Sequence, residues 1–249
     1  MNAMQRQFQP EIQYSNEFCA DHNEPKISMF GRATCPTCAK QLLAQAQVDH
    51  EHAVNQMVRE KHFAGSMLPV RHETSGFRNY LVEHDEQRIA KIECHDFAKD
   101  QVKGSIRNLI MVGRTGTGKT HLACAVARNV LDARKYVRYI TSEDMANEIA
   151  NAWTKPDDSE ASAIYRFTEY DLLILDEYGL HDQHEKRLAL VHKVLYSRYD
   201  AKKSTMLISN WTIEQLKENL GDRLWSRFQH DGLTIVNCNW ADQRTGGAV

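Results

Sequence analysis

The stretch from residue 106 to residue 121 places glycines, a lysine and a threonine at a spacing that suits phosphate binding. Gly113, Gly116 and Gly118 allow the backbone to turn sharply and to bring its N–H groups against phosphate oxygens. Lys119 would reach the β- and γ-phosphates of a nucleotide, and the Thr120 hydroxyl would hold Mg²⁺. The predicted nucleotide-binding segment is completed by Arg114, Thr115, Thr117 and His121.

Two carboxylates, Asp176 and Glu177, follow a run of four aliphatic residues. Such a run is typical of a buried central strand, and open α/β sheets bind ligands at the carboxyl ends of their strands. Asp176 would orient the Mg²⁺ shell, and Glu177 would polarise the attacking water as general base. A solvated acidic turn is the alternative. Asn210 also follows an apolar run, and its amide would lie beside the γ-phosphate if that strand neighbours the phosphate-loop strand.

Four residues near the N-terminus have the spacing of a metal site, with Cys19 and His22 as one pair and Cys35 and Cys38 as the second. Each pair spans a tight turn, and together they supply the ligands of a closed tetrahedral zinc site. We therefore predict structural Zn²⁺, with unliganded thiols or redox chemistry as the alternatives. Because so small a module buries little surface, metal binding would contribute much of its folding free energy.

The composition of the 249 residues carries no strong electrostatic message, since the net charge is −2. Nucleic acid is therefore neither indicated nor excluded as a partner. The sequence has no apolar run near the roughly 20 residues of a membrane helix and no secretory signal at its start, so we expect a cytoplasmic protein that binds no membrane. The remaining cysteines, Cys94, Cys124 and Cys238, are expected to fill the core.

The region from residue 77 onward alternates apolar strands with helix-compatible segments. The expected strands are 109–112, 136–140, 172–175, 205–208 and 233–236. The expected helices are 86–102, 121–130, 142–153 and 184–199. This alternation predicts an α/β fold with a parallel sheet covered on both faces.

The region before residue 77 reads differently. Residues 1–18 are polar and show no periodic pattern, whereas apolar residues from 40 to 64 recur at helical spacing. That helix would either pack on its own zinc module or bind a partner. We predict a zinc-binding and helical partner-binding module at 1–65, a linker at 66–76 and the nucleotide-binding domain at 77–249.

Four segments and a short entry motif resemble AAA+ ATPases, specifically the bacterial replicative-helicase loaders of the DnaC and DnaI type in the IstB-like superfamily. The segments are 113–120, 172–177, 209–210 and 221–228, and the entry is the Phe-x-Asn-Tyr at 77–80. The resemblance implies a three-layer sandwich around a five-stranded parallel sheet, with Asn210 as the sensor amide. The segment Gly-Asp-Arg-Leu-x-Ser-Arg-Phe is similar to the box that carries an arginine finger. By that resemblance Arg227 would serve a neighbouring subunit's ATP, with Arg223 supporting it or competing for the role.

The resemblance also implies an activity and partners. The activity would be ATP hydrolysis to ADP and phosphate, and the partners would be a hexameric replicative DNA helicase and single-stranded DNA. Subunits would act side by side, by self-association or on the helicase. Family loaders contact DNA near the segment that corresponds to 144–155, where Trp153 would stack on a base and Lys155 would meet a phosphate. A buried Trp153 is the alternative. A transposition helper ATPase of the IstB type and a non-hydrolysing ATP-binding adaptor remain the alternative functions.

Overall fold

The computed structural model describes residues 13–29, 32–180 and 185–243. Contacts divide the chain into two compact units, residues 1–57 and residues 58–249. The division falls inside a single helix, α1 (Pro36–Ser66), and before the predicted end of the N-terminal module. The predicted module limits therefore remain a prediction.

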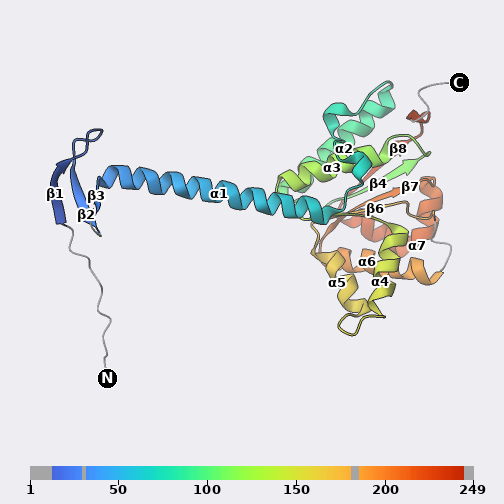
Figure 1. The fold of residues 1–249 in the computed structure, drawn as a ribbon. Helices are drawn as coiled ribbons and strands as arrows, with labels where there is room; N and C mark the ends of the chain where they lie inside the picture. Colours follow the sequence, from blue (N-terminus) through green and yellow to red (C-terminus); the bar gives the residue numbers. More distant parts are fainter. Residues whose placement is uncertain (1–12, 30–31, 181–184, 244–249) are drawn as a thin grey trace. The chain divides into compact units, whose positions relative to one another are not determined.

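The first unit contains a small antiparallel sheet in the order β1-β2-β3 (Figure 1). Its strands are β1 (Gln13–Phe18), β2 (Pro25–Met29) and β3 (Arg32–Thr34). Residues 1–18 were open to two interpretations, a loose end or a part of the module around Cys19, and β1, which leads directly to Cys19, agrees with the second for residues 13–18. Tyr14 and Phe18 of this strand are 68% and 60% exposed, so burial imposes no alternating pattern that the sequence could reveal.

Helix α1 contains the whole of the predicted helix 40–64. It begins at Pro36, a residue preorganised for the first helical position. Within the second unit, Phe63 of α1 packs against the core, and Arg59 forms an ion pair with Asp132 at 2.7 Å. Although α1 has 31 residues, neither it nor any other helix in the described part of the chain is apolar enough to cross a membrane.

The second unit is built on a five-stranded parallel sheet in the order β5-β6-β7-β4-β8 (Figure 1). The strands are β4 (Asn108–Gly113), β5 (Val137–Thr141), β6 (Leu172–Asp176), β7 (Ser204–Ser209) and β8 (Leu233–Cys238). The helices are α2 (Asp85–Lys103), α3 (Lys119–Asp132), α4 (Ser142–Ala152), α5 (Glu160–Glu169), α6 (Glu185–Asp200) and α7 (Ile213–His230). The predicted α/β fold with a five-stranded parallel sheet is confirmed.

Both faces of this sheet are buried, as the continuous aliphatic strands predict. In β6, Leu172 and Ile174 belong to the core cluster formed with α2 and α3. The alternate residues Leu173 and Leu175 belong to the cluster formed with α4, α5, α6 and α7. The period of two along the strand therefore divides the core into the two halves of a three-layer sandwich.

The structure contains helical residues in two regions where the sequence analysis expected none. Helix α5 was not predicted, although Ser159 accepts from the Ser162 N–H as its N-cap. Helix α7 was not among the expected helices, although its second half carries the two arginines of the 221–228 motif and Thr212 and Gln215 form a capping box at its start. Gly221, with φ 70°, interrupts α7 midway and weakens the helical pattern there.

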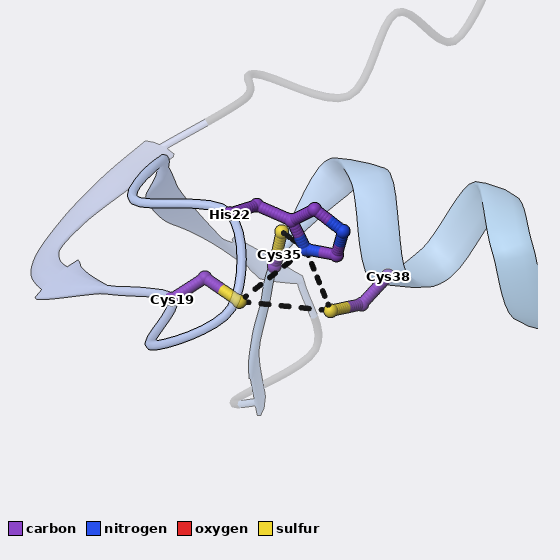
Figure 2. Close-up of side chains that lie close together, drawn as sticks. All are labelled: Cys19, His22, Cys35 and Cys38. Atoms are coloured by element: carbon purple, nitrogen blue, oxygen red, sulfur yellow. Dashed lines mark hydrogen bonds between the residues drawn. The ribbon is translucent and has the colours of Figure 1, made fainter.

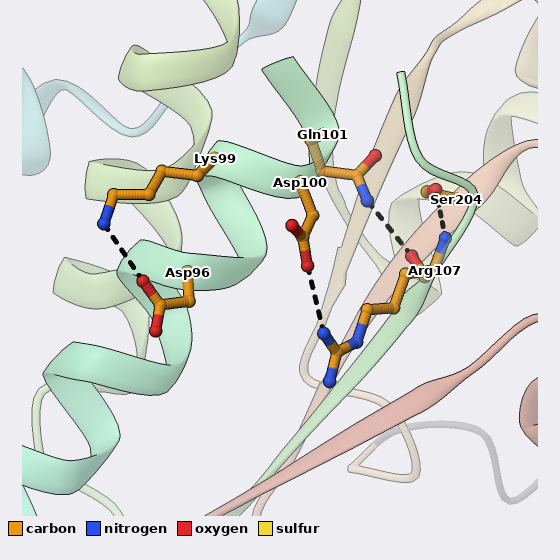
Figure 3. A network of polar contacts seen from close by, with 6 residues as sticks. All are labelled: Asp96, Lys99, Asp100, Gln101, Arg107 and Ser204. Carbon is orange, nitrogen blue, oxygen red and sulfur yellow. Dashed lines mark hydrogen bonds and ion pairs between the residues drawn. The ribbon is translucent and has the colours of Figure 1, made fainter. Parts of the chain in front are cut away.

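The loop before β4 is tied to both α2 and β7 (Figure 3). The Arg107 guanidinium pairs with Asp100 at 3.0 Å, and the Gln101 amide donates to the Arg107 carbonyl at 3.2 Å. The Arg107 N–H donates to the Ser204 hydroxyl at 3.1 Å. These contacts fix where β4 starts, and therefore where the glycine-rich loop at its other end begins.

Candidate active site and metal centre

The glycine-rich loop joins the end of β4 to the start of α3, as the sequence predicts. Gly113 has φ 139°, and a Cβ atom at that position would lie 2.1 Å from the Cys238 carbonyl oxygen of the adjacent β8. Glycine is therefore required both by conformation and by space. Lys119 is the first residue of α3, so the free N–H groups of that helix face the loop.

The Lys119 ammonium is held inside the loop and is only 7% exposed. Its Nζ atom donates to the carbonyl oxygens of Gly113 at 2.7 Å and Arg114 at 2.6 Å. The Thr117 hydroxyl donates to the same Arg114 carbonyl at 2.8 Å. A phosphate oxygen would offer this ammonium a charged acceptor, which forms a stronger hydrogen bond than a neutral carbonyl.

Asp176, the acidic residue that ends β6, lies against the loop. The Thr120 hydroxyl donates to Asp176 Oδ2 at 3.1 Å, and the Glu177 N–H donates to Asp176 Oδ1 at 2.7 Å. The Tyr139 hydroxyl also donates to Oδ2. Asp176 is 5% exposed, so its charge is stabilised mainly by these donors. Thr120 and Asp176, the two residues predicted to hold Mg²⁺, thus lie in contact.

Glu177 stands at the turn that follows Asp176 and is exposed. Its φ of 57° lies in the left-handed region, which costs a non-glycine residue on the order of 1 kcal/mol or more. The next residue holds the turn in place, because the Tyr178 N–H donates to the Ile208 carbonyl at 3.0 Å and the Ser209 hydroxyl donates to the Tyr178 carbonyl at 2.8 Å. The Glu177 carboxylate is therefore presented by a turn fixed at both ends.

Asn210 directly follows β7, and β7 is the neighbour of β4 on one side. Val112 of β4 pairs with Ser209, which brings Asn210 to the level of Gly113. A cavity of about 480 Å³ opens between them, and its lining includes Gly113, Arg114 and Asn210. The sequence analysis expected the Asn210 amide beside the γ-phosphate only if its strand neighbours the phosphate-loop strand. Strands β7 and β4 are neighbours, so this condition is met.

The four predicted zinc ligands form one cluster in the first unit (Figure 2). Cys19 follows β1, Cys35 follows β3 and Cys38 lies in the first turn of α1. His22 Nδ1 lies 3.6 Å from Cys19 Sγ, 3.7 Å from Cys35 Sγ and 3.4 Å from Cys38 Sγ. The Cys19 and Cys38 sulfurs are 3.6 Å apart.

These distances fit a tetrahedral ion. Zn–S bonds of about 2.3 Å and Zn–N bonds of about 2.0 Å separate the ligand atoms of a tetrahedron by roughly 3.5 to 3.8 Å. Hydrogen bonding to His22 lowers the pKa of Cys19 to about 6, which favours the thiolate that a metal needs. The neighbouring Cys19 sulfur raises the pKa of Cys38 to about 12. A bound cation would stabilise the Cys38 thiolate and so lower the pKa of Cys38. The donor set therefore suits Zn²⁺.

The comparison with protein families decides the relationship of the chain. The model of the IstB-like ATP binding protein matches residues 32–234. The chain belongs to this family. Replicative helicase loader DnaC of Escherichia coli K12 is 26% identical to this IstB-like chain over 203 residues, or 82% of each protein. The uncharacterized protein YdaV of the same organism is 28% identical over 203 residues, or 80% of each.

Solved structures show the same fold as this IstB-like chain. A crystal structure of the DnaC helicase loader matches with a TM-score of 0.61 at 18% identity, covering 68% of the chain and 99% of the loader. A DnaI crystal structure gives 0.56 at 17% identity, covering 72% and 95%. Domain III of the Thermotoga maritima replication initiation protein DnaA gives 0.58 at 24% identity, covering 70% of each. The predicted resemblance to DnaC and DnaI loaders is confirmed.

The two arginines of the IstB-like chain's last motif lie on α7 after the Gly221 kink. The Arg227 guanidinium lies 4.8 Å from the ring centroid of Tyr196 and 4.8 Å from that of Tyr199. It also lies 3.5 Å from the Asp200 carboxylate. Arg223 is exposed and makes no hydrogen bond or ion pair with any described residue.

Arg227 lies near the amino ends of the parallel strands, opposite to the carboxyl ends that the glycine-rich loop follows. Together with Asn108, the first residue of β4, it lines a small cavity, whereas Gly113 is the last residue of that strand. A strand of six residues spans about 20 Å. Arg227 therefore lies near the amino ends of the strands, whereas the glycine-rich loop lies at their carboxyl ends. At that distance it does not reach a phosphate bound at the loop of its own subunit.

The structure also places two residues that were predicted to contact ligands, His121 and Trp153. His121 donates from Nε2 to the Gly76 carbonyl at 3.0 Å, so its ring supports the entry segment of the domain. Trp153 is 62% exposed, and the alternative of a buried tryptophan is wrong. It lies just after the end of α4, where the chain turns away from the core, and Lys155 beside it is also exposed.

Two segments near the loop had no assigned part in it. The Tyr80 ring lies against Gly118, where a Cβ atom would come within 3.0 Å of Cε2, and its buried hydroxyl has no hydrogen-bond partner among the described residues. From the other end of the chain, Trp240 Nε1 donates to the Thr117 carbonyl at 2.9 Å, and the Gln243 N–H donates to the Gly116 carbonyl at 2.9 Å. The entry motif at 77–80 was the sequence signal for Tyr80, whereas no motif indicated the contacts of Trp240 and Gln243.

Proposed function

We propose that this chain is an ATP-dependent loader that places a replicative DNA helicase on single-stranded DNA. The observation that carries the proposal is the hydrogen bond between Thr120 and Asp176 beside the buried Lys119. This contact occurs in a chain that is similar to a DnaC loader over 82% of the length of each protein. A role in helicase loading is supported by the family and by the relatives' printed function. Hydrolysis of ATP, the partners and the residue roles below are part of the proposal.

In this proposal the loop residues bind and orient the triphosphate. The N–H groups of the loop and of the start of α3 would bind phosphate oxygens, and Lys119 would leave its loop carbonyls for the β- and γ-phosphates. Thr120 and Asp176 would hold Mg²⁺, which neutralises charge on the β- and γ-oxygens. Glu177 would accept the proton of the attacking water, and Asn210 would hydrogen-bond to the γ-phosphate.

The N-terminal unit would bind the hexameric helicase. The Cys19, His22, Cys35 and Cys38 cluster would hold structural Zn²⁺ and so stabilise the small sheet. Helix α1 exposes large apolar side chains in this unit, among them Leu42 at 68% and Leu43 at 66%. Exposed apolar groups on a helix suit a partner surface.

Single-stranded DNA would bind at the end of α4. Trp153 offers a ring for base stacking, and Lys155 offers a cation for a phosphate. The acidic side chains of α4 oppose DNA binding less than their number suggests. Glu143 pairs with Arg187 at 3.2 Å, and Glu148 pairs with Arg138 at 3.1 Å, so two of these charges are neutralised within the protein.

The position of Arg227 supports an assembly of subunits in this proposal. Because its own phosphate loop lies at the opposite sheet edge, this arginine would serve the ATP of a neighbouring subunit. Arg223 lies four residues earlier on the same helix, about 6 Å along its axis. It would support Arg227 or replace it.

The test is ATP turnover by the full chain with a replicative helicase hexamer and single-stranded DNA, together with recovery of helicase on the DNA. We expect Glu177→Gln to abolish turnover and Glu218→Gln, an exposed acid on α7, to leave it unchanged. Equal turnover by wild type and Glu177→Gln would favour the non-hydrolysing adaptor. Normal turnover without any helicase binding would favour the transposition helper.

A further inference from the structure

Tyr139 is a buried residue of strand β5 that belongs to none of the nucleotide-binding motifs. It pairs with Ile174 in the parallel ladder between β5 and β6, and it is 9% exposed. Its ring lies in the same core cluster as the residues of α3, on the face of the sheet from which Thr120 also reaches Asp176. The Tyr139 hydroxyl therefore approaches the Asp176 carboxylate from a third element, besides the glycine-rich loop and the turn after β6.

The hydrogen bonds of Asp176 leave little freedom to its carboxylate. Oδ1 accepts the Glu177 N–H at 2.7 Å, while Oδ2 accepts the hydroxyls of Thr120 and Tyr139. Donors on both oxygens fix the rotation of the carboxylate plane. The Glu177 and Thr120 donors come from residues that would themselves be engaged during catalysis, but the Tyr139 donor comes from the sheet. Tyr139 has no part of its own in the proposed catalysis, so its hydroxyl is free to serve the orientation of Asp176 alone.

The phenol is the donor in this contact, because a carboxylate oxygen accepts and the Tyr139 hydroxyl supplies the proton. A buried hydroxyl requires a partner, and a carboxylate is a stronger acceptor than a carbonyl. Phenylalanine would fill the same space without this bond.

We propose that Tyr139 is a positioning residue for Mg²⁺, which fixes the Asp176 carboxylate beside the Thr120 hydroxyl before the metal binds. This inference rests on the proposed ATP site and adds a residue to it. Groups that orient a metal ligand typically change metal affinity about 10- to 100-fold when they are removed. We therefore expect loss of the Tyr139 hydroxyl to weaken Mg²⁺ binding and to spare binding of the nucleotide alone.

The experiment compares wild type with Tyr139→Phe by titration of a fluorescent ATP analogue, first in EDTA and then at increasing Mg²⁺. Affinity in EDTA should be unchanged, and the Mg²⁺ concentration for half-maximal tightening should rise about tenfold. Tyr165→Phe is the matched control, since Tyr165 is 62% exposed on α5. Circular dichroism checks that each variant is folded, and the Mg²⁺ dependence of ATP turnover should shift in parallel.

Three outcomes separate the possibilities. An unchanged Mg²⁺ dependence in Tyr139→Phe, with or without a lower unfolding temperature, would show that the hydroxyl serves only the core and would overturn the inference. Equal loss of affinity in EDTA and in Mg²⁺ would assign it to the nucleotide pocket instead. If wild type binds the analogue without any effect of Mg²⁺, the inference fails together with the Mg²⁺ role of Thr120 and Asp176, whereas absence of any analogue binding by wild type would overturn the proposed ATP site itself.

Discussion

The Thr120 hydroxyl lies 3.1 Å from Asp176 Oδ2, although 56 residues separate them in the chain. Strand β7 stands between their strands in the sheet, so strand pairing alone does not bring them together. The contact is made by α3, which crosses over the sheet from the end of β4 and presents its first turn to the end of β6. A parallel sheet thus collects groups from separate strands at one edge.

This contact predicts different effects for two substitutions of Thr120. Thr120→Ser keeps a hydroxyl that can ligate Mg²⁺ and donate to Asp176, so ATP turnover should stay within about threefold of wild type. Thr120→Ala removes both interactions, and turnover should fall about 100-fold or more. Steady-state ATPase assays at saturating Mg²⁺ measure both. Equal activity of the two variants would contradict a role in metal binding.

The position of Arg227 predicts complementation between subunits. Arg227→Ala alone should lower ATP turnover at least about 100-fold, as loss of an arginine finger does. Glu177→Gln should be inactive as well but would still carry the arginine. If the finger acts in trans, mixing the two inactive proteins should restore part of the turnover, because Glu177→Gln supplies the arginine to an intact site.

The same mixing experiment with Arg223→Ala identifies which arginine is the finger. The finger is the arginine whose substitution abolishes ATP turnover and whose variant regains turnover when it is mixed with Glu177→Gln. The variant of the other arginine should then have normal turnover by itself. Arg227→Lys is a needed control, since the Arg227 guanidinium also stacks between Tyr196 and Tyr199 and lies near Asp200. An assembly defect in that control would show that the stacking itself shapes the subunit surface.

The fold was predictable because its strands are buried on both faces. Four consecutive aliphatic residues in β6 can belong only to a central element, and the glycine spacing after β4 fixed the edge of the sheet that binds ligands. Strand β1 and helix α5 escaped prediction for the opposite reason. Tyr14 and Phe18 are exposed, and α5 has only 10 residues in which to show a period.

The candidate site was predictable where neighbours in sequence act together and was incomplete where they do not. The four zinc ligands come as two pairs at fixed spacing, so local turns reveal them. Tyr139 reaches Asp176 across 37 residues, and Trp240 reaches Thr117 across 123. Neither contact leaves a trace in the local pattern. Exposure of Trp153 likewise depends on where α4 ends relative to the core.

The six cysteines should react in two groups of three. Burial raises the pKa of Cys124 and of Cys238 to about 12, and Cys94 is fully buried with a raised pKa as well. At pH 8 the thiolate fraction of groups with such a pKa is on the order of 1 in 10,000, and reactivity requires the thiolate.

A thiol reagent at pH 8 should therefore label almost nothing in the zinc-loaded protein. A chelator should unfold the small N-terminal module, which separates Cys38 from the Cys19 sulfur that raises its pKa, and so expose three thiols, those of Cys19, Cys35 and Cys38; denaturation should expose all six. Elemental analysis should find about one zinc per chain. Fast labelling of the N-terminal thiols without chelator, together with less than about half an equivalent of zinc, would remove the zinc model.

Exposure of Trp153 predicts a contribution to DNA binding. Stacking of a base on an aromatic side chain is worth about 1 to 3 kcal/mol, so Trp153→Ala should weaken binding of a short oligonucleotide about 5- to 150-fold. Trp153→Phe should keep most of the affinity. Fluorescence anisotropy at fixed salt measures both, and Lys155→Ala should reduce the salt dependence. Unchanged affinity in Trp153→Ala would place the DNA elsewhere.

The contact of Trp240 with the glycine-rich loop predicts a loss of stability that reaches the nucleotide. Trp240→Phe leaves the buried Thr117 carbonyl without its donor, and an unsatisfied buried group costs about 1 to 3 kcal/mol. The unfolding temperature should fall by several degrees, and saturating ATP should recover part of the difference because ligand binding stabilises the folded state.

Trp153→Phe is the matched control for that substitution, since it makes the same chemical change at an exposed site and should leave both the unfolding temperature and ATP affinity unchanged. The diagnostic quantity is the affinity for ATP, because a tryptophan that merely fills the core would lower stability alone. A loop held at Thr117 by Trp240 has fewer conformations to lose when phosphate binds, so its release should also weaken ATP binding severalfold. A drop in unfolding temperature with wild-type ATP affinity would restrict Trp240 to the core.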